Sequence, residues 1–164
     1  MTGPDTLKIT TRGDRELVMT RAFDAPRHLV FEAYTRPEHL KRWLGMHNGW
    51  SLEVCDIDLR VGGAYRYLWR GPNGAEMGMR GIYREVVSPA RLVATEVFDE
   101  SWYPGEAVDT LELVERDGRT ILTVTVRYES REARDAVLQS PMEQGVAAGY
   151  DKLAEVLATL ARNP

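Results

Sequence analysis

The stretch SPMEQGVAAGYDKLAEVLATL at residues 140–160 decides the fold. Its apolar side chains recur at helical spacing from Met142 to Leu160, and charged side chains occupy the opposite face. Ser140 and Glu143 form a capping-box pattern, with Pro141 at the first helical position. We therefore predict one amphipathic helix of about 20 residues, which is long enough to cross a whole sheet and must bury its apolar stripe.

The chain before this helix alternates between apolar and polar side chains, which is typical of strands. Turn residues separate the strands, and Asp117-Gly118 is a hairpin signal. A change in the alternation between Val54 and Cys55 predicts a β-bulge. We predict seven strands, at residues 15–23, 50–60, 65–70, 77–83, 91–98, 108–115 and 120–129.

Two short helices are predicted directly after the first strand. Residues 27–34 carry an apolar stripe, and Asp24 could cap that helix. Thr35 and Glu38 form a capping box that opens the second helix. A further short helix is predicted at 131–139, just before the long one.

The order of these elements predicts an α+β fold. A sheet of about six to seven mostly antiparallel strands twists too strongly to stay flat, so it should curl around the long C-terminal helix. A curled sheet that holds a helix leaves a hollow between them unless large side chains fill it. We expect a loose leader at residues 1–14 and a single ligand-binding domain at residues 15–162.

The composition excludes several classes of protein. Of 164 residues, 43% are apolar and 28% charged, which argues against a disordered chain. The net charge of −4 disfavours a nucleic-acid partner, and no apolar run is long enough to span a membrane. The N-terminus has no secretory signal pattern, and the single cysteine, Cys55, excludes an internal disulfide, so we expect a cytoplasmic protein. No metal site or cofactor is expected, since HxxxH, CxxC and dinucleotide patterns are absent.

An ordered set of motifs resembles a known family. The set comprises RAFDAP at 21–26, VFEAYTRPEHL at 30–40 followed by Trp43, DLRVGG at 58–63, GIYREVV at 81–87, RLV at 91–93, MEQG at 142–145 and YDKL at 150–153. Together these motifs resemble the SRPBCC (START/Bet v 1-like) superfamily. Within it they resemble the stand-alone bacterial branch named after the activator of heat-shock protein 90 ATPase.

The resemblance runs from about residue 15 to residue 162 and implies the helix-grip fold, with a pocket for small apolar or amphipathic molecules between the sheet and the last helix. It does not imply one reaction, because superfamily members include lipid carriers, hormone receptors, polyketide cyclases and antibiotic-sequestering proteins. Leu44 and Tyr150 stand where many relatives have tryptophan, so a relative's ligand cannot be carried over.

Aromatic, methionine and glycine side chains are the candidate lining of this pocket, because they combine adaptable apolar surface with a few polar tips. Any one of them could instead be plain core. Two glycines four residues apart in the last helix favour either a ligand against bare backbone or tight packing on the sheet. The candidate ligand-binding residues are Trp43, Tyr65, Tyr67, Trp69, Met77, Met79, Tyr83, Trp102, Met142, Gly145, Val146, Gly149 and Tyr150.

The candidates for acid–base chemistry are Glu96, Tyr83 and His47. Glu96 interrupts an apolar strand face, and a carboxyl group in an apolar cleft has a raised pKa. The alternative is that Glu96 pairs with a strand arginine, while Asp99 and Glu100 are solvated loop residues. The candidate arginines are Arg66, Arg70, Arg80 and Arg84. No nucleophile elbow or phosphate-binding loop is present, and Cys55 is expected to be a buried, inert thiol.

Three functions remain open at this point. The first is a module that sequesters, carries or senses a small hydrophobic molecule. The second is an enzyme of the cyclase, dehydratase or hydrolase type that uses acid–base residues in the same pocket, and the third is an interaction module resembling a chaperone co-factor. A homodimer could form through a sheet edge or through residues 99–107, and the same loop could be a lid over the pocket.

Overall fold

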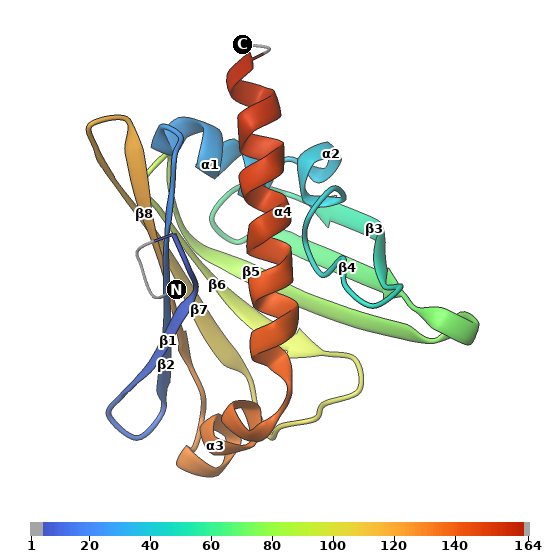
Figure 1. The fold of residues 1–164 in the computed structure, drawn as a ribbon. Coiled ribbons are helices and arrows are strands. Elements are labelled where there is room, and N and C mark those ends of the chain that lie inside the picture. Colours follow the sequence, from blue (N-terminus) through green and yellow to red (C-terminus); the bar gives the residue numbers. More distant parts are fainter. Residues whose placement is uncertain (1–4, 163–164) are drawn as a thin grey trace.

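A computed structural model describes residues 5–162 and shows a single curved sheet that holds a long helix (Figure 1). The sheet has eight antiparallel strands in the order β1-β2-β8-β7-β6-β5-β4-β3. The elements are β1 (Lys8–Arg12), β2 (Glu16–Phe23), α1 (Arg27–Thr35), α2 (Pro37–Leu40), β3 (Ser51–Ile57), β4 (Ala64–Arg70), the 3₁₀ turn η1 (Pro72–Gly74), β5 (Glu76–Val87), β6 (Arg91–Phe98), β7 (Ala107–Arg116), β8 (Arg119–Arg127), α3 (Arg131–Gln139) and α4 (Met142–Arg162).

The first strand corrects the prediction for the N-terminal segment. Residues 8–12, expected to belong to a loose leader, form β1 and pair with β2 in register, with Ile9 opposite Met19. The strand count is therefore eight, slightly higher than predicted. Residues 1–4 of the predicted leader lie outside the described residues.

Two irregularities help the sheet to curl. The register shifts between Leu52 and Val54 in β3 and between Tyr83 and Glu85 in β5. The first shift lies just before Val54, next to the position between Val54 and Cys55 where the bulge was predicted. Bulges increase local twist, and the curved sheet presents a concave face to α4 (Figure 1).

The helix caps differ from the sequence prediction. The residue that caps α1 is Pro26, without a side-chain hydrogen bond, and Asp24 plays no part. The Thr35 hydroxyl donates to the Phe31 carbonyl at 2.7 Å instead of capping α2. The Ser140 hydroxyl likewise donates to the Val137 carbonyl at 2.6 Å, so it closes α3. Serine and threonine hydroxyls often bond back to a carbonyl three or four residues earlier, and both do so here instead of capping the next helix.

The two halves of α4 meet different surroundings. Leu153, Val156 and Leu157 in the second half are buried in the main core. Residues 142–148 in the first half are half-buried or exposed, although their apolar stripe continues. The helix is therefore packed on the sheet along one half and stands over open space along the other. Among residues 5–162, no helix is both long and apolar enough to cross a membrane.

Candidate functional site

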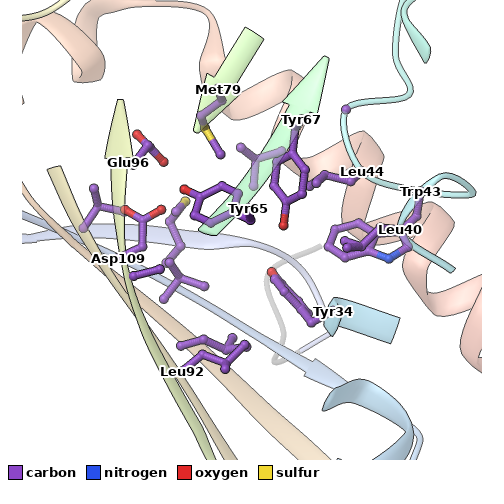
Figure 2. A pocket seen from close by; sticks show the side chains of 18 of the residues that line it. Tyr34, Leu40, Trp43, Leu44, Tyr65, Tyr67, Met79, Leu92, Glu96 and Asp109 are labelled. Atoms are coloured by element: carbon purple, nitrogen blue, oxygen red, sulfur yellow. The ribbon is translucent and has the colours of Figure 1, made fainter. Parts of the chain in front are cut away.

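A cavity of about 330 Å³ lies between the concave face of the sheet and the first half of α4. Strands β2 and β4–β8 supply one wall, and α1, α2, the following corner and α4 supply the other (Figure 2). It is lined by Met19, Tyr34, Leu40, Trp43, Leu44, Gly45, Tyr65, Tyr67, Trp69, Met77, Met79, Tyr83, Leu92, Ala94, Glu96, Asp109, Leu111, Val124, Val126, Gly145, Val146, Gly149 and Tyr150.

The strand periodicity explains which side chains reach the cavity. Side chains of a strand point alternately to its two faces, so every second residue lines the same wall. In β4 these residues are Tyr65, Tyr67 and Trp69, and the structure places all three on the concave face. The sequence predicted that these three side chains share one face of the strand. Which face is concave depends on how the sheet curls.

All but two of the predicted ligand-binding residues line this cavity. Trp102 does not, since it lies in the loop before β7 with 44% of its surface exposed, packed edge-on against Phe98 and Tyr103. Met142 is partly buried against the core outside the lining. Of the acid–base candidates, Glu96 and Tyr83 line the cavity and His47 does not.

Two carboxyl groups, Glu96 and Asp109, lie together at one end of the cavity (Figure 2). In the β6–β7 ladder Asp109 is opposite Ala94, and Glu96 is opposite Ala107. The two acids are therefore diagonal neighbours on the same face, a spacing that long side chains bridge. Glu96 also accepts a hydrogen bond of 2.7 Å from the Tyr103 hydroxyl.

Asp109 is the most perturbed acid in the described chain. Burial raises the pKa of Asp109 well above its usual value, and the neighbouring charge of Glu96 raises it further. The Asp109 Oδ1 atom is shielded from solvent and has no hydrogen-bond partner. Because like charges at this spacing disfavour ionisation, Asp109 holds its proton to a higher pH than an ordinary aspartate does.

The opposite end of the cavity is aromatic. The hydroxyls of Tyr34 and Tyr150 are hydrogen-bonded to each other at 2.7 Å. Trp43 packs edge-on against Tyr34, with ring centroids 4.9 Å apart, and its Nε1 donates to the Ala33 carbonyl at 3.0 Å. Burial raises the pKa of Tyr150 to about 12 and that of Tyr34 further, so both hydroxyls are neutral at physiological pH.

The β4 side chains separate the two ends. The Tyr65 hydroxyl donates to the Thr95 carbonyl at 2.6 Å, and the Trp69 Nε1 donates to the Leu44 carbonyl at 3.0 Å. Burial raises the pKa of Tyr65, Tyr67 and Tyr83 above the usual value. The three tyrosines are therefore neutral, and the polar tips of Tyr65 and Trp69 are occupied by backbone carbonyls.

The alternative interpretation of Glu96 as the partner of a strand arginine is wrong. Arg66 and Arg80 both pair with Asp99, at 2.7 and 3.0 Å, so Asp99 is also not a simple solvated loop residue. The remaining candidate arginines form ion pairs elsewhere, Arg70 with Glu76 and Arg84 with Glu106. Exposed pairs of this kind contribute little to stability, but they do leave Glu96 free of a protein cation.

The sequence analysis missed Asp109 and Tyr34. Asp109 shares its strand parity with Leu111 and Leu113, and that signal could have identified an acid on an inward face. Tyr34 belongs to the apolar stripe of α1, but its contact with Tyr150 joins segments 116 residues apart. Cys55 is buried in the core, and burial raises the pKa of its thiol to about 11, in line with an inert thiol.

The glycines of α4 line the cavity for different reasons. A Cβ atom at Gly149 would lie 3.4 Å from the Trp43 carbonyl oxygen, so this glycine packs against the corner after α2. A Cβ atom at Gly145 would meet only the His47 ring, at 3.9 Å. Close packing therefore accounts for Gly149 but not for Gly145. Residues 5–162 contain no group of three or more His, Cys, Asp or Glu side chains placed to hold a metal ion.

A curved antiparallel sheet that holds a long helix over an apolar cavity defines the helix-grip class of ligand-binding and interaction modules. Within that class, the model of the family described as Activator of Hsp90 ATPase homolog 1-like protein matches residues 24–158. The chain belongs to this family, which confirms the resemblance found in the sequence.

Solved structures agree with this assignment. The chain is similar to a Rhodobacter sphaeroides protein at 34% identity, with a TM-score of 0.89 over 94% of this chain and 99% of that one. It is also similar to a Chromobacterium violaceum protein (26% identity, TM-score 0.74, 87% and 96% covered) and a Mycobacterium smegmatis protein (25%, 0.81, 93% and 96%). No curated protein matches the chain.

Proposed function

We propose that the protein binds a small, largely hydrophobic molecule in the cavity between the sheet and α4, for sequestration, transport or sensing. The cavity itself is the observation that carries this proposal. Its volume of about 330 Å³ is within the range of about 300–1,000 Å³ typical of ligand pockets. Protein interiors are otherwise close-packed, with few voids larger than a water molecule.

The lining supports a predominantly apolar ligand. Aromatic, aliphatic and methionine side chains make up most of it, and methionine adapts its shape to different ligands. The tyrosine hydroxyls are mostly bonded within the protein, as at Tyr65 and Tyr34. Met77 is 41% exposed although it lines the cavity, and so it marks an open rim through which a ligand could enter.

Native mass spectrometry of gently purified protein tests this function first, because it detects a retained molecule and gives its mass. Thermal-shift titration with a panel of apolar metabolites follows. Ala94 lies on the cavity wall, so Ala94→Leu should fill part of the space and weaken binding by at least about tenfold, the effect of roughly 1.4 kcal/mol of lost contact.

Ala64→Leu is the matched control, since Ala64 is exposed on β4 outside the lining. It should leave the affinity unchanged. Equal affinity of the Ala94→Leu variant and the native protein would place the ligand elsewhere. If no compound of the panel binds saturably and mass spectrometry detects no retained molecule, the proposed function is contradicted.

An enzymatic role is a second candidate, favoured by the Glu96–Asp109 pair. A carboxyl group whose pKa is raised by burial and by a second carboxyl group beside it is an arrangement used for general acid–base catalysis, as in dehydration, cyclisation or hydrolysis. Incubating the identified ligand with the native protein should then convert it, and Asp109→Asn should slow the conversion at least about 100-fold. An unchanged ligand after prolonged incubation would remove this candidate.

A further inference from the structure

The carboxyl end of the cavity lacks a partner that the protein itself could supply. Asp109 lines the cavity, and its Oδ1 atom is buried without a hydrogen bond. A buried polar atom without a partner costs about 1–3 kcal/mol, so such atoms are rare in native structures unless a ligand or water completes them. Asp109 therefore brings an unsatisfied acceptor to the wall of the ligand space.

The same end also lacks a positive charge. Within residues 5–162, no lysine, arginine or histidine forms an ion pair with Glu96 or Asp109. Arg21, whose charge acts on the cavity residue Tyr150, is already paired with Asp151 at 2.9 Å. Any negative charge on these two acids is therefore left without a protein cation, in largely apolar surroundings.

The groups around the pair are neutral. Glu96 from β6 is the one acid that interacts with Asp109 among the described residues. The other titratable side chains that interact with it are tyrosines, which come from α1, β4, α4, the 99–106 loop and the segment after β8. The pKa of each of these tyrosines is raised, so at neutral pH only the acid pair exchanges a proton there. The tyrosines are Tyr34, Tyr65, Tyr67, Tyr103, Tyr128 and Tyr150.

Aromatic rings complete a site suited to a cation. The rings of Tyr65 and Tyr67 are tilted by 44° with centroids 4.8 Å apart, and the ring centroid of Tyr83 lies 5.6 Å from that of Tyr65. The faces of such rings attract cations, more strongly where water is excluded. An aromatic wall beside a buried negative charge is a recognised arrangement for binding ammonium groups.

We infer that the ligand is an apolar amine, bound as its ammonium form, with the nitrogen donating to Asp109 and Glu96 and the apolar body lying along the β4 aromatics toward Trp43. This inference rests on the proposed function and specifies its ligand. An incoming cation favours the fully ionised form of the acid pair, so binding should release a proton from the pair to the solvent.

Matched probes separate charge from shape. Three series, built on one, two and three fused aromatic rings, each contain an arylmethylamine, the arylmethanol and the methylarene. The amine and the alcohol have nearly the same size and both can donate a hydrogen bond, but only the amine is charged at pH 7. Isothermal titration calorimetry at pH 7 in two buffers with different ionisation heats gives both affinity and protons released.

In the series that fits best, the amine should bind at least about tenfold more tightly than the alcohol and release up to one proton per site. Asp109→Asn and Glu96→Gln should each reduce this preference to within about twofold. Glu112→Gln is the control, because Glu112 is an exposed acid on the same strand that pairs with Arg91 at 3.0 Å on the outer face. It should keep the full preference.

The outcomes distinguish the two proposals. An alcohol that binds the native protein as tightly as its amine would overturn this inference and leave the proposed function intact. An amine preference that survives in both Asp109→Asn and Glu96→Gln would also overturn it, since the cation would then bind elsewhere. If no member of the three series binds, the proposed function and this inference are both overturned. Circular dichroism of each variant verifies that the fold is retained.

Discussion

The two ends of the cavity hold polar pairs of opposite character. At the aromatic end, the Tyr34 and Tyr150 hydroxyls satisfy each other at 2.7 Å, and Trp43 is bonded to backbone. At the carboxyl end, burial and the neighbouring charge of Glu96 raise the pKa of Asp109, and its Oδ1 atom has no hydrogen-bond partner. Both ends are buried in the same cavity, so burial alone does not explain the difference.

The difference indicates which end is structural and which is functional. A satisfied polar pair stabilises the fold and specifies one arrangement of the elements that carry it, here α1 and α4. An incompletely satisfied pair lowers stability, and proteins retain such groups mainly where they act on something else. Substitutions at the aromatic end should therefore destabilise the protein, whereas substitutions at the carboxyl end should not.

The largest expected effect is that of Trp43→Ala. The ring is 2% exposed and contacts both Tyr34 and Tyr150, so its removal leaves a cavity next to an existing one. The free energy of unfolding should fall by about 3–5 kcal/mol, measured by urea denaturation. Trp102→Ala, at the exposed tryptophan, is the control and should cost less than about 1 kcal/mol. Equal losses would show that the aromatic end has no special structural role.

The second prediction concerns the pH dependence contributed by Asp109. Its pKa is raised in the folded state from the ordinary value of 3.8, so above that pH the unfolded chain loses a proton that the folded protein keeps. Stability contributed by this group is therefore highest at low pH and falls as the pH rises toward the folded-state pKa. The fall is at most about 1.4 kcal/mol per pH unit, the linkage of one proton.

Asp109→Asn should remove that fall. Relative to the native protein, the variant should become progressively more stable as the pH is raised above about 4, measured as urea midpoints between pH 4 and pH 8. Glu112→Gln on the outer face of the same strand should show no such trend. Parallel pH profiles for Asp109→Asn and the native protein would mean that Asp109 ionises normally, which contradicts the comparison.

The third prediction is the counterpart at the aromatic end. Tyr34→Phe removes one member of the hydroxyl pair and leaves the Tyr150 hydroxyl without this partner, so it should cost about 0.5–1.5 kcal/mol. Tyr150→Phe should cost a similar amount, and the double variant less than the sum, which a double-mutant cycle measures. The coupling should stay constant between pH 4 and pH 8, because the raised tyrosine pKa values keep both hydroxyls protonated. Coupling that varies in that range would show that the pair responds to the acids.

Much of the fold could be predicted from the sequence because its signals are local. The stripe of α4 and the alternation in β4 follow from 3.6- and 2-residue periods. The exception is β1, KITTR at residues 8–12, which has Ile9 as its single large apolar residue. An edge strand held by pairing with β2 needs no apolar face of its own, so no local pattern indicates it.

The site was less predictable because its key contacts depend on register and curvature. Glu96 was identified as an acid on an apolar strand face, but its partner Asp109 is 13 residues away and meets it through the β6–β7 register. His47 and Trp102 were selected as aromatic or titratable side chains near turns, and the curl of the sheet leaves both outside the lining. Sequence periodicity gives the parity of a side chain, whereas curvature decides whether it faces a cavity.

The smallest expected effect separates the two glycines of α4. A helix-interior glycine costs about 1 kcal/mol relative to alanine, and Gly145→Ala should recover most of it because the new Cβ meets nothing closer than 3.9 Å. Gly149→Ala should recover somewhat less, since its Cβ would lie 3.4 Å from the Trp43 carbonyl oxygen, at the short end of ordinary van der Waals contact. Thermal unfolding of the two variants measures the difference. A larger gain in stability at Gly149 would mean that the corner at Trp43 is loosely packed. That result would contradict the structural role assigned to the aromatic end.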